Sequence, residues 1–114
     1  MKRLFVSDLD GTLLNGNAEV SEKTAQIINQ VIGKGIDFTI STARTPSTAL
    51  KIIEPLHINL PVMMMNGVLV YDMKSKQYLK KETMDETVVM VLLGLIKTKG
   101  LSCFLYALGF YLRR

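Results

Sequence analysis

The alternation of strand-like and helix-like patterns in the first 65 residues most constrains the fold. Apolar runs at 3–8, 36–42 and 62–65 are separated by a helical pattern over 22–34 and by a second one that starts at Pro46 and ends before Pro55. Strands that alternate with helices build parallel α/β sheets, because each helix returns the chain to the same end of the sheet. We therefore expect an α/β, Rossmann-like partial core, with strand 3–8 buried in a parallel sheet.

The next part of the chain changes character. Asn66-Gly67 is a strong hairpin signal and predicts a turn into a strand over 68–71. A further turn at 73–77 and a strand over 78–82 complete a β-hairpin region. We expect residues 1–82 to form one part of the chain and residues 83–114 a second, incomplete α+β part.

The second part opens on a helix pattern. Thr83 and Glu86 fit a capping box, and Gly100 follows a helix predicted to end near Lys99. Its expected buried side is apolar at helical spacing. That side comprises Val89, Leu92, Leu93 and Ile96. Residues 101–112 read as a strand, in which Cys103 is expected to be a buried small apolar residue.

Composition excludes several classes of protein. The chain has 114 residues with one Cys and one His, so it has no internal disulfide, and a structural zinc site is not expected. The net charge of +4 is scattered over turns and helix ends, which favours a solvated face over a nucleic-acid surface. The longest uncharged stretches, 87–96 and 101–112, are too short to cross a bilayer. We expect a cytoplasmic protein without a nucleic-acid or membrane partner.

Chemistry-bearing residues concentrate where the first strand ends, in Asp8-Leu9-Asp10-Gly11-Thr12. Ligands of open α/β sheets bind at this carboxyl edge, and alternate side chains of an extended chain share one direction. Two such carboxylates attract a hard cation, and one can attack phosphorus. Gly11 permits a sharp turn, and Thr12 offers a hydroxyl and a backbone donor. A bare Asp-x-Asp is also compatible with an ordinary acidic turn.

Two further polar segments follow later strands. Thr42-Ala43-Arg44 leads from the second strand toward a helix N-terminus, where anions bind readily. Thr42 can donate its hydroxyl to a phosphoryl oxygen, and Arg44 can approach substrate or pair with a surface carboxylate. Asn66-Gly67 follows the third strand and, taken alone, is a simple turn signal.

Together the three segments resemble the haloacid dehalogenase-like phosphohydrolases, in the branch often called Cof-type. The string from Asp8 to Leu14 is similar to the first signature of that family, and Thr42-Ala43-Arg44 to a Thr-Gly-Arg step. Ala43 replaces the glycine of that step. Asn66-Gly67-Val68 is similar to an Asn-Gly-Ala step. The matches cover about residues 3–72, and 83–100 is similar to the start of the mobile cap domain of the branch.

The resemblance implies a Mg²⁺-dependent hydrolysis of phosphate monoesters, often sugar phosphates. Asp8 would take the phosphoryl group, and Asp10 would protonate the leaving oxygen and then activate water. The Asp8 carboxylate and the Asp10 backbone carbonyl would hold Mg²⁺. The residues expected to bind the substrate phosphate are Gly11, Thr12, Thr42, Arg44, Asn66 and Gly67. The partner implied is a small phosphorylated metabolite.

Two elements that the family needs lack a counterpart here: a Lys after the cap, and an acidic pair after a later core strand. The later acidic residues are Glu82, Asp85 and Glu86, all near a predicted helix start. We therefore expect a truncated protein or a fragment whose catalysis is impaired. The alternative is an inactive chain that binds only metal or phosphate, or that self-associates through its apolar C-terminal segment.

A phospho-accepting receiver domain is a third hypothesis. It has a similar length and acidic residues after its first strand. It requires an acceptor Asp at the end of the third strand, where this chain has Met65-Asn66. The sequence thus disfavours a receiver domain.

Overall fold

The computed structural model describes residues 2–107. The chain divides into two compact units, Met1–Glu82 (unit 1) and Thr83–Arg114 (unit 2).

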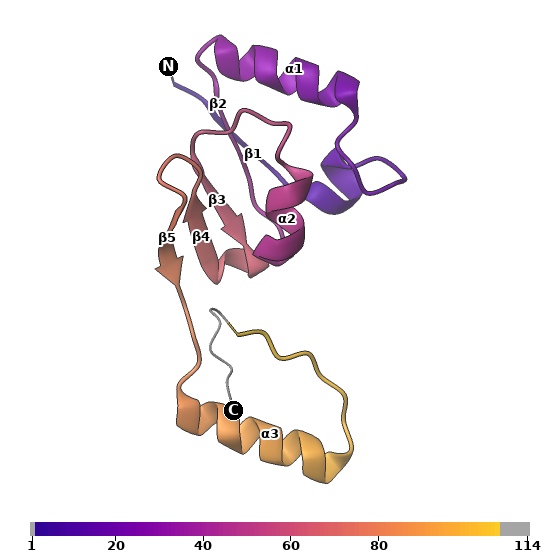
Figure 1. Ribbon diagram of the computed structural model, residues 1–114, viewed down its shortest axis with the longest axis vertical. Helices are drawn as coiled ribbons and strands as arrows, with labels where there is room; N and C mark the ends of the chain where they lie inside the picture. The colour runs from indigo at the N-terminus through magenta and orange to yellow at the C-terminus, as the bar shows by residue number, and fades with distance from the viewer. Residues whose placement is uncertain (1, 108–114) are drawn as a thin grey trace. The chain divides into compact units, whose positions relative to one another are not determined.

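Unit 1 is a mixed α/β structure (Figure 1). Its elements in chain order are β1 (Leu4–Ser7), α1 (Glu22–Gly33), β2 (Asp37–Ile40), α2 (Pro46–Ile52), β3 (Pro61–Met64), β4 (Leu69–Asp72) and β5 (Gln77–Lys81). The first strands and helices alternate, and β4 and β5 then add a hairpin region. The predicted α/β architecture with parallel strands is confirmed.

Parallel and antiparallel pairing meet within unit 1. β1 pairs with β2 in parallel, from Leu4 opposite Asp37 to Ser7 opposite Ile40. β3, β4 and β5 form an antiparallel sheet, with an irregularity between Val70 and Tyr71. A parallel bridge between Ser41 and Met63 links the end of β2 to β3. The third strand thus connects the parallel pair to the hairpin sheet.

Local sequence explains where the helices begin. The Ser21 hydroxyl accepts a hydrogen bond from Thr24 N at 3.1 Å, which satisfies a free amide in the first turn of α1. Pro46 is the first residue of α2, a position that needs no amide hydrogen. Thr45 stands at the cap position of α2 without a side-chain cap bond.

The core of unit 1 lies between the two helices and the strands. Leu9, Ile40, Ile53, Val62, Met64 and Leu69 are the largest side chains that are fully buried. Thr39 is also buried, and its hydroxyl donates to the carbonyl of Pro61. The buried hydroxyl therefore has a partner, and that partner ties β2 to the start of β3.

The predicted burial of the first strand is wrong for this chain. Leu4 is 59% exposed, and Phe5 and Val6 are each 49% exposed. The cause is its position, because β1 pairs with β2 along one edge and no other described strand flanks it. Its three consecutive apolar residues have the composition of an interior parallel strand.

Unit 2 contains α3 (Glu86–Lys99), and the expected capping box does not form. Asp85 occupies the cap position without a side-chain cap bond to the backbone, and accepts a hydrogen bond from the Thr87 hydroxyl instead. The C-terminal prediction is confirmed, since Gly100 ends the helix in the left-handed conformation with φ 64°. No residue of α3 is buried, and Leu92, expected on its buried side, is 40% exposed.

The segment after α3 also differs from expectation. Residues 101–107 form no regular strand, and the remainder of the expected strand, 108–112, lies outside the described residues. Cys103 is exposed rather than buried. Phe104 and Tyr106 stack with ring centroids 6.4 Å apart, and both are exposed. Within residues 2–107 no helix has the length and apolar character to cross a membrane.

Adjacent isoleucines of α1 test the position of the core. Ile28 is 8% exposed and Ile27 is 52% exposed. Ile28→Ala should lower the free energy of unfolding by about 2–3 kcal/mol, because it leaves a cavity in the core. Ile27→Ala is the matched control and should cost less than about 1 kcal/mol. Urea titration followed by circular dichroism measures both, and equal losses would contradict this packing.

Candidate active site

Backbone hydrogen bonds hold together the segments that follow β1, β2 and β3. Ser41 N donates to Ser7 O at 2.9 Å, and Thr42 N donates to Met63 O at 3.0 Å. Asn66 N in turn donates to Thr42 O at 3.1 Å, and Met65 N to Arg44 O at 3.0 Å. The three motifs singled out in the sequence therefore meet at one edge of unit 1.

The segment after β1 is a wide turn anchored by one buried side chain. Leu9 is fully buried, whereas Asp8 and Asp10 on either side of it are exposed. Leu14 N donates to Leu9 O at 3.1 Å and closes the turn. Gly11 within it has φ 77°, a conformation that residues with a Cβ adopt at a cost. Leu9 thus fixes the turn while both carboxylates remain accessible.

The Asp8 carboxylate is oriented by its own backbone. Oδ1 accepts a hydrogen bond from Leu9 N at 2.7 Å. Among the hydrogen bonds and ion pairs of residues 2–107, none involves Oδ2. One oxygen is therefore held, and the other is left to meet a ligand.

Arg44 reaches from the segment after β2 to Asp10. Its Nε and Nη2 donate to the two carboxylate oxygens of Asp10, each at 2.7 Å. This two-pronged geometry is the strongest form of carboxylate–guanidinium pairing. The Arg44 side chain is 26% exposed and that of Asp10 is 55% exposed, so the pair faces solvent.

The pair changes the acid–base properties of both groups. The hydrogen bonds from Arg44 hold the pKa of Asp10 below its usual value and outweigh desolvation, which acts to raise it. The same bonds raise the pKa of Arg44. Asp10 is therefore held as the carboxylate, the form that can accept a proton.

Thr42 and Asn66 occupy very different environments. Thr42 is 3% exposed, and its hydroxyl oxygen accepts a hydrogen bond from Arg44 N at 3.1 Å. Asn66 is exposed and lies in a left-handed turn, with φ 57° there and 91° at Gly67. The backbone of this turn binds the Thr42 carbonyl, so Asn66 and Gly67 lie next to the second motif. Thr12 is exposed in the turn after β1.

The donor atoms suit a hard cation in type but not in number. Asp8 offers a carboxylate oxygen, and Asp10 offers a backbone carbonyl, both of which are ligands that Mg²⁺ prefers. No group of three or more His, Cys, Asp or Glu side chains comes together among residues 2–107. The residues present can therefore hold part of an octahedral shell, with water and substrate oxygens as further ligands.

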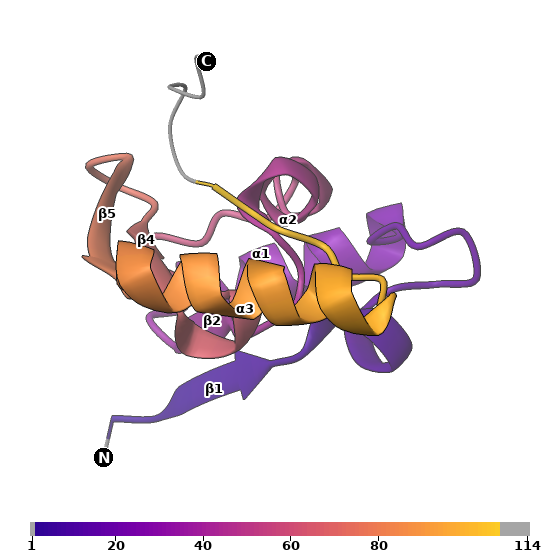
Figure 2. The ribbon, with the colours of Figure 1, turned by 90° about the horizontal axis from the view of Figure 1, so that it is seen from below.

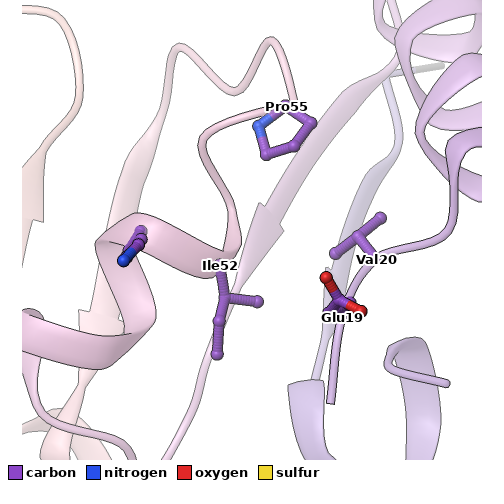
Figure 3. A pocket seen from close by; sticks show the side chains of 5 residues that line it. Glu19, Val20, Ile52 and Pro55 are labelled. Carbon is purple, nitrogen blue, oxygen red and sulfur yellow. The ribbon is translucent and has the colours of Figure 1, made fainter. Parts of the chain in front are cut away.

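A separate hollow lies between the segment before α1 and the end of α2. It measures about 260 Å³, and Figure 3 shows its lining side chains. The lining residues are Glu19, Val20, Lys51, Ile52 and Pro55. No predicted site residue lines it, so the candidate site is the open edge that carries Asp8 and Asp10.

Sequence reasoning missed two contributors to the site. Leu9 is buried and anchors the turn. In the sequence, an apolar residue between two carboxylates in an alternating pattern indicates such a buried position. The pairing of Arg44 with Asp10 in particular was also missed. No local signal gives that partner, because the two residues are 34 positions apart.

Comparison with known proteins gives the family. The profile of the haloacid dehalogenase-like hydrolases matches residues 5–112. The chain belongs to the haloacid dehalogenase-like hydrolases. Phosphatase YwpJ from Bacillus subtilis is 36% identical over 84 residues, which are 74% of this chain and 29% of YwpJ.

Two other relatives extend the comparison. A 5-amino-6-(5-phospho-D-ribitylamino)uracil phosphatase, YcsE from Bacillus subtilis, is 33% identical over 70 residues, 61% of this chain and 28% of YcsE. A haloacid dehalogenase-like hydrolase from Bacteroides thetaiotaomicron superposes with a TM-score of 0.77 at 24% identity. That superposition covers 88% of this chain and 39% of the other and shows a shared fold. The chain thus spans about three-tenths of the two curated relatives.

The left-handed glycine of the first motif is open to a direct test. A Cβ at Gly11 would meet no atom within 4 Å, so any cost of Gly11→Ala comes from its φ of 77° alone. We expect a loss of about 1 kcal/mol in the free energy of unfolding. Gly16→Ala, also without a steric contact and without a positive φ, is the matched control. Equal unfolding midpoints in urea for the two variants would contradict the left-handed conformation at Gly11.

The ion pair predicts a pH-dependent difference between wild type and Arg44→Gln. Without the guanidinium, the pKa of Asp10 should rise to the ordinary value of about 3.9. A lowered folded-state pKa adds stability above the unfolded value, and this stability is lost as the pH falls through the folded value. The melting temperatures should therefore differ at pH 7 and converge below about pH 4.

The direct measurement is a carbon-13 NMR titration of the Asp10 carboxyl in both proteins. Lys51→Gln removes a positive charge elsewhere, from an exposed position of α2, and should leave the titration of Asp10 unchanged. Equal Asp10 pKa values in wild type and Arg44→Gln would disprove the pair.

Proposed function

We propose that this chain carries the nucleophile half of a Mg²⁺-dependent phosphohydrolase that acts on small phosphate monoesters through an aspartyl-phosphate. The proposal places the chain in the Cof-type branch, with residues from 83 onward as the beginning of a cap, and in the cytoplasm. The phosphatase names of YwpJ and YcsE support the reaction class. The latter name supports a phosphorylated metabolite as substrate.

The proposal rests on the different hydrogen bonds that the two carboxylates make. Asp8 is fixed through one oxygen by Leu9 N and keeps the other oxygen available. Asp10 lies two residues further on and is bound through both oxygens by Arg44. The free oxygen of Asp8 suits a nucleophile, and the carboxylate form of Asp10 suits the base that takes a proton from water in the second step.

The reaction would proceed in two steps on these residues. An Asp8 carboxylate oxygen attacks phosphorus, the bond from phosphorus to the ester oxygen breaks, and protonated Asp10 gives its proton to that leaving oxygen. Water then attacks the aspartyl-phosphate, Asp10 takes the proton of the water, and phosphate leaves with Asp8 restored. Arg44 opposes protonation of Asp10, so Arg44 must move or find another anion before the first step.

The phosphate-binding residues would surround this centre. Arg44 can turn one face of its guanidinium to a phosphoryl oxygen, and Thr42 would orient the phosphoryl group from the adjoining segment. Gly11, Thr12, Asn66 and Gly67 would line the approach. Mg²⁺, held by the Asp8 carboxylate and the Asp10 carbonyl, would offset the repulsion between the carboxylate and the substrate phosphate.

The second hypothesis is an inactive chain that binds metal or phosphate only, or that self-associates through its apolar C-terminal segment. The incomplete set of acidic ligands within residues 2–107 favours it. The exposed Phe104 and Tyr106 favour the self-associating form. Phosphate turnover distinguishes the two hypotheses.

Release of phosphate from an aryl phosphate, with and without Mg²⁺, tests the proposal. Wild type should show turnover that requires Mg²⁺, and Asp8→Asn should abolish it, because the amide is not a nucleophile. Asp37→Asn makes the same chemical change in β2, outside the proposed machinery, and should keep the wild-type rate. A folded wild type without turnover would support the inactive chain, and equal rates for wild type and Asp8→Asn would reject Asp8 as nucleophile.

A further inference from the structure

The hollow between the segment before α1 and the end of α2 combines apolar surface with two opposite charges. Its apolar lining is Val20, Ile52 and Pro55, and its charged lining is Glu19 and Lys51, both exposed. Figure 1 and Figure 2 both show the segment that leads into α1 beside α2. The lining residues all lie within 19–55, so the part of unit 1 that contains α1, β2 and α2 forms both walls of the hollow.

The wall before α1 is fixed by hydrogen bonds of Asn15. Its side-chain carbonyl accepts from Asn17 N at 2.9 Å and from Glu19 N at 3.1 Å, and its main-chain amide donates to Glu19 O at 2.9 Å. Ala18 in this loop has φ 57°, which is unfavourable for a residue with a Cβ. Strained residues persist where the surrounding bonds hold them, and they are common at ligand-binding sites. Glu19 and Val20 are therefore presented from a fixed loop.

The opposite wall is fixed by Asn29 of α1. The Asn29 side-chain amide donates to Pro55 O at 3.0 Å, and its side-chain carbonyl accepts from His57 N at 2.7 Å. These two bonds tie the loop after α2 to α1. Because hydrogen bonds hold both walls in place, a ligand finds the hollow already formed and its binding carries little cost of ordering.

The two charges that line the hollow are not used within the described part of the chain. Among the ion pairs of residues 2–107, none involves Glu19 or Lys51. Figure 3 shows the Glu19 carboxylate facing Ile52, an apolar side chain that cannot neutralise it. The ammonium group of Lys51 stands on a flexible four-carbon stem and can move toward a ligand. A molecule that carries both an ammonium and a carboxylate group would satisfy Glu19 and Lys51 together.

The size of the hollow limits the ligand to a small metabolite. Its volume is about 260 Å³, whereas pockets for drug-sized ligands measure roughly 300–1,000 Å³. We propose that the hollow binds a small zwitterion with an aliphatic body, which is the chemistry of a free aliphatic α-amino acid. The ammonium group pairs with Glu19, the carboxylate pairs with Lys51, and the aliphatic body lies against the apolar lining. This site is separate from the candidate active site and does not rest on the proposed phosphatase activity.

Methyl NMR of the full chain, titrated with L-leucine, tests the proposal. The methyl signals of Val20 and Ile52 should shift, with a dissociation constant of about 1 mM or lower. The signals of Ile27, which is exposed on α1 and does not line the hollow, should stay in place. Glycine carries the same two charges without an aliphatic body and should bind at least about tenfold more weakly, because it buries no apolar side chain.

Two variants separate the contributions of the charges. Glu19→Gln should weaken leucine binding about fivefold, and Lys51→Gln should do the same, because each removes one ion pair with the ligand. Isocaproate has no ammonium group and should bind Glu19→Gln no more weakly than wild type. Isoamylamine has no carboxylate and should bind Lys51→Gln no more weakly than wild type. Glu54→Gln, at an exposed position outside the lining, is the matched control and should bind leucine as wild type does.

The same probes keep the test valid if a variant fails to fold. In wild type, isocaproate and isoamylamine should each bind about fivefold more weakly than leucine. Methyl signals of Val20 and Ile52 that do not move with leucine would overturn the proposal. Isoamyl alcohol that binds wild type as tightly as leucine would also overturn it, since the hollow would then take apolar molecules without regard to charge.

Discussion

The candidate site depends on backbone hydrogen bonds that run across the ends of three strands. Ser41 binds the end of β1, Thr42 binds β3, and Asn66 binds the Thr42 carbonyl. These bonds are made by main-chain atoms, so they position Asp8, Thr42 and Asn66 with little dependence on the side chains themselves. Because backbone groups at this edge are paired with one another, the side chains remain available for ligands.

Arg44 adds a polar connection across the same edge. Its main chain is held by the Thr42 hydroxyl and by Met65 N, and its guanidinium binds Asp10. One residue therefore contacts all three segments. In the proposed reaction, a phosphoryl group would compete with Asp10 for this guanidinium, and ligand binding would then be coupled to the freedom of the Asp10 carboxylate.

The periodic parts of the fold were predictable from local patterns. The Ser21 cap, Pro46 at the start of α2 and Gly100 after α3 act within a few residues, and the structure has each in its expected place. The exposure of β1 was not predictable, because burial depends on neighbours that the strand sequence does not specify. The capping box did not form because α3 begins two residues later than that motif requires, with Asp85 rather than Thr83 at the cap position.

The proximity of the three motif segments was predictable from the sequence, whereas the side-chain partners within them were not. The motifs place Asp8, Thr42 and Asn66 at strand ends, and parallel topology brings those ends to one edge. The pairing of Asp10 with Arg44 joins residues 34 positions apart and depends on the rotation of both side chains. Sequence patterns do not encode that rotation.

The left-handed turn at Asn66 has a consequence for evolution at this position. Met65, Asn66 and Gly67 have φ values of 52°, 57° and 91°, so three successive residues occupy a region that most side chains avoid. Asn, Asp and Gly tolerate this region better than other residues. In the proposed function Asn66 also lines the approach of the substrate. Selection for the turn and selection for that role would then act on the same residue, and an asparagine retained there would not by itself reveal which requirement preserved it.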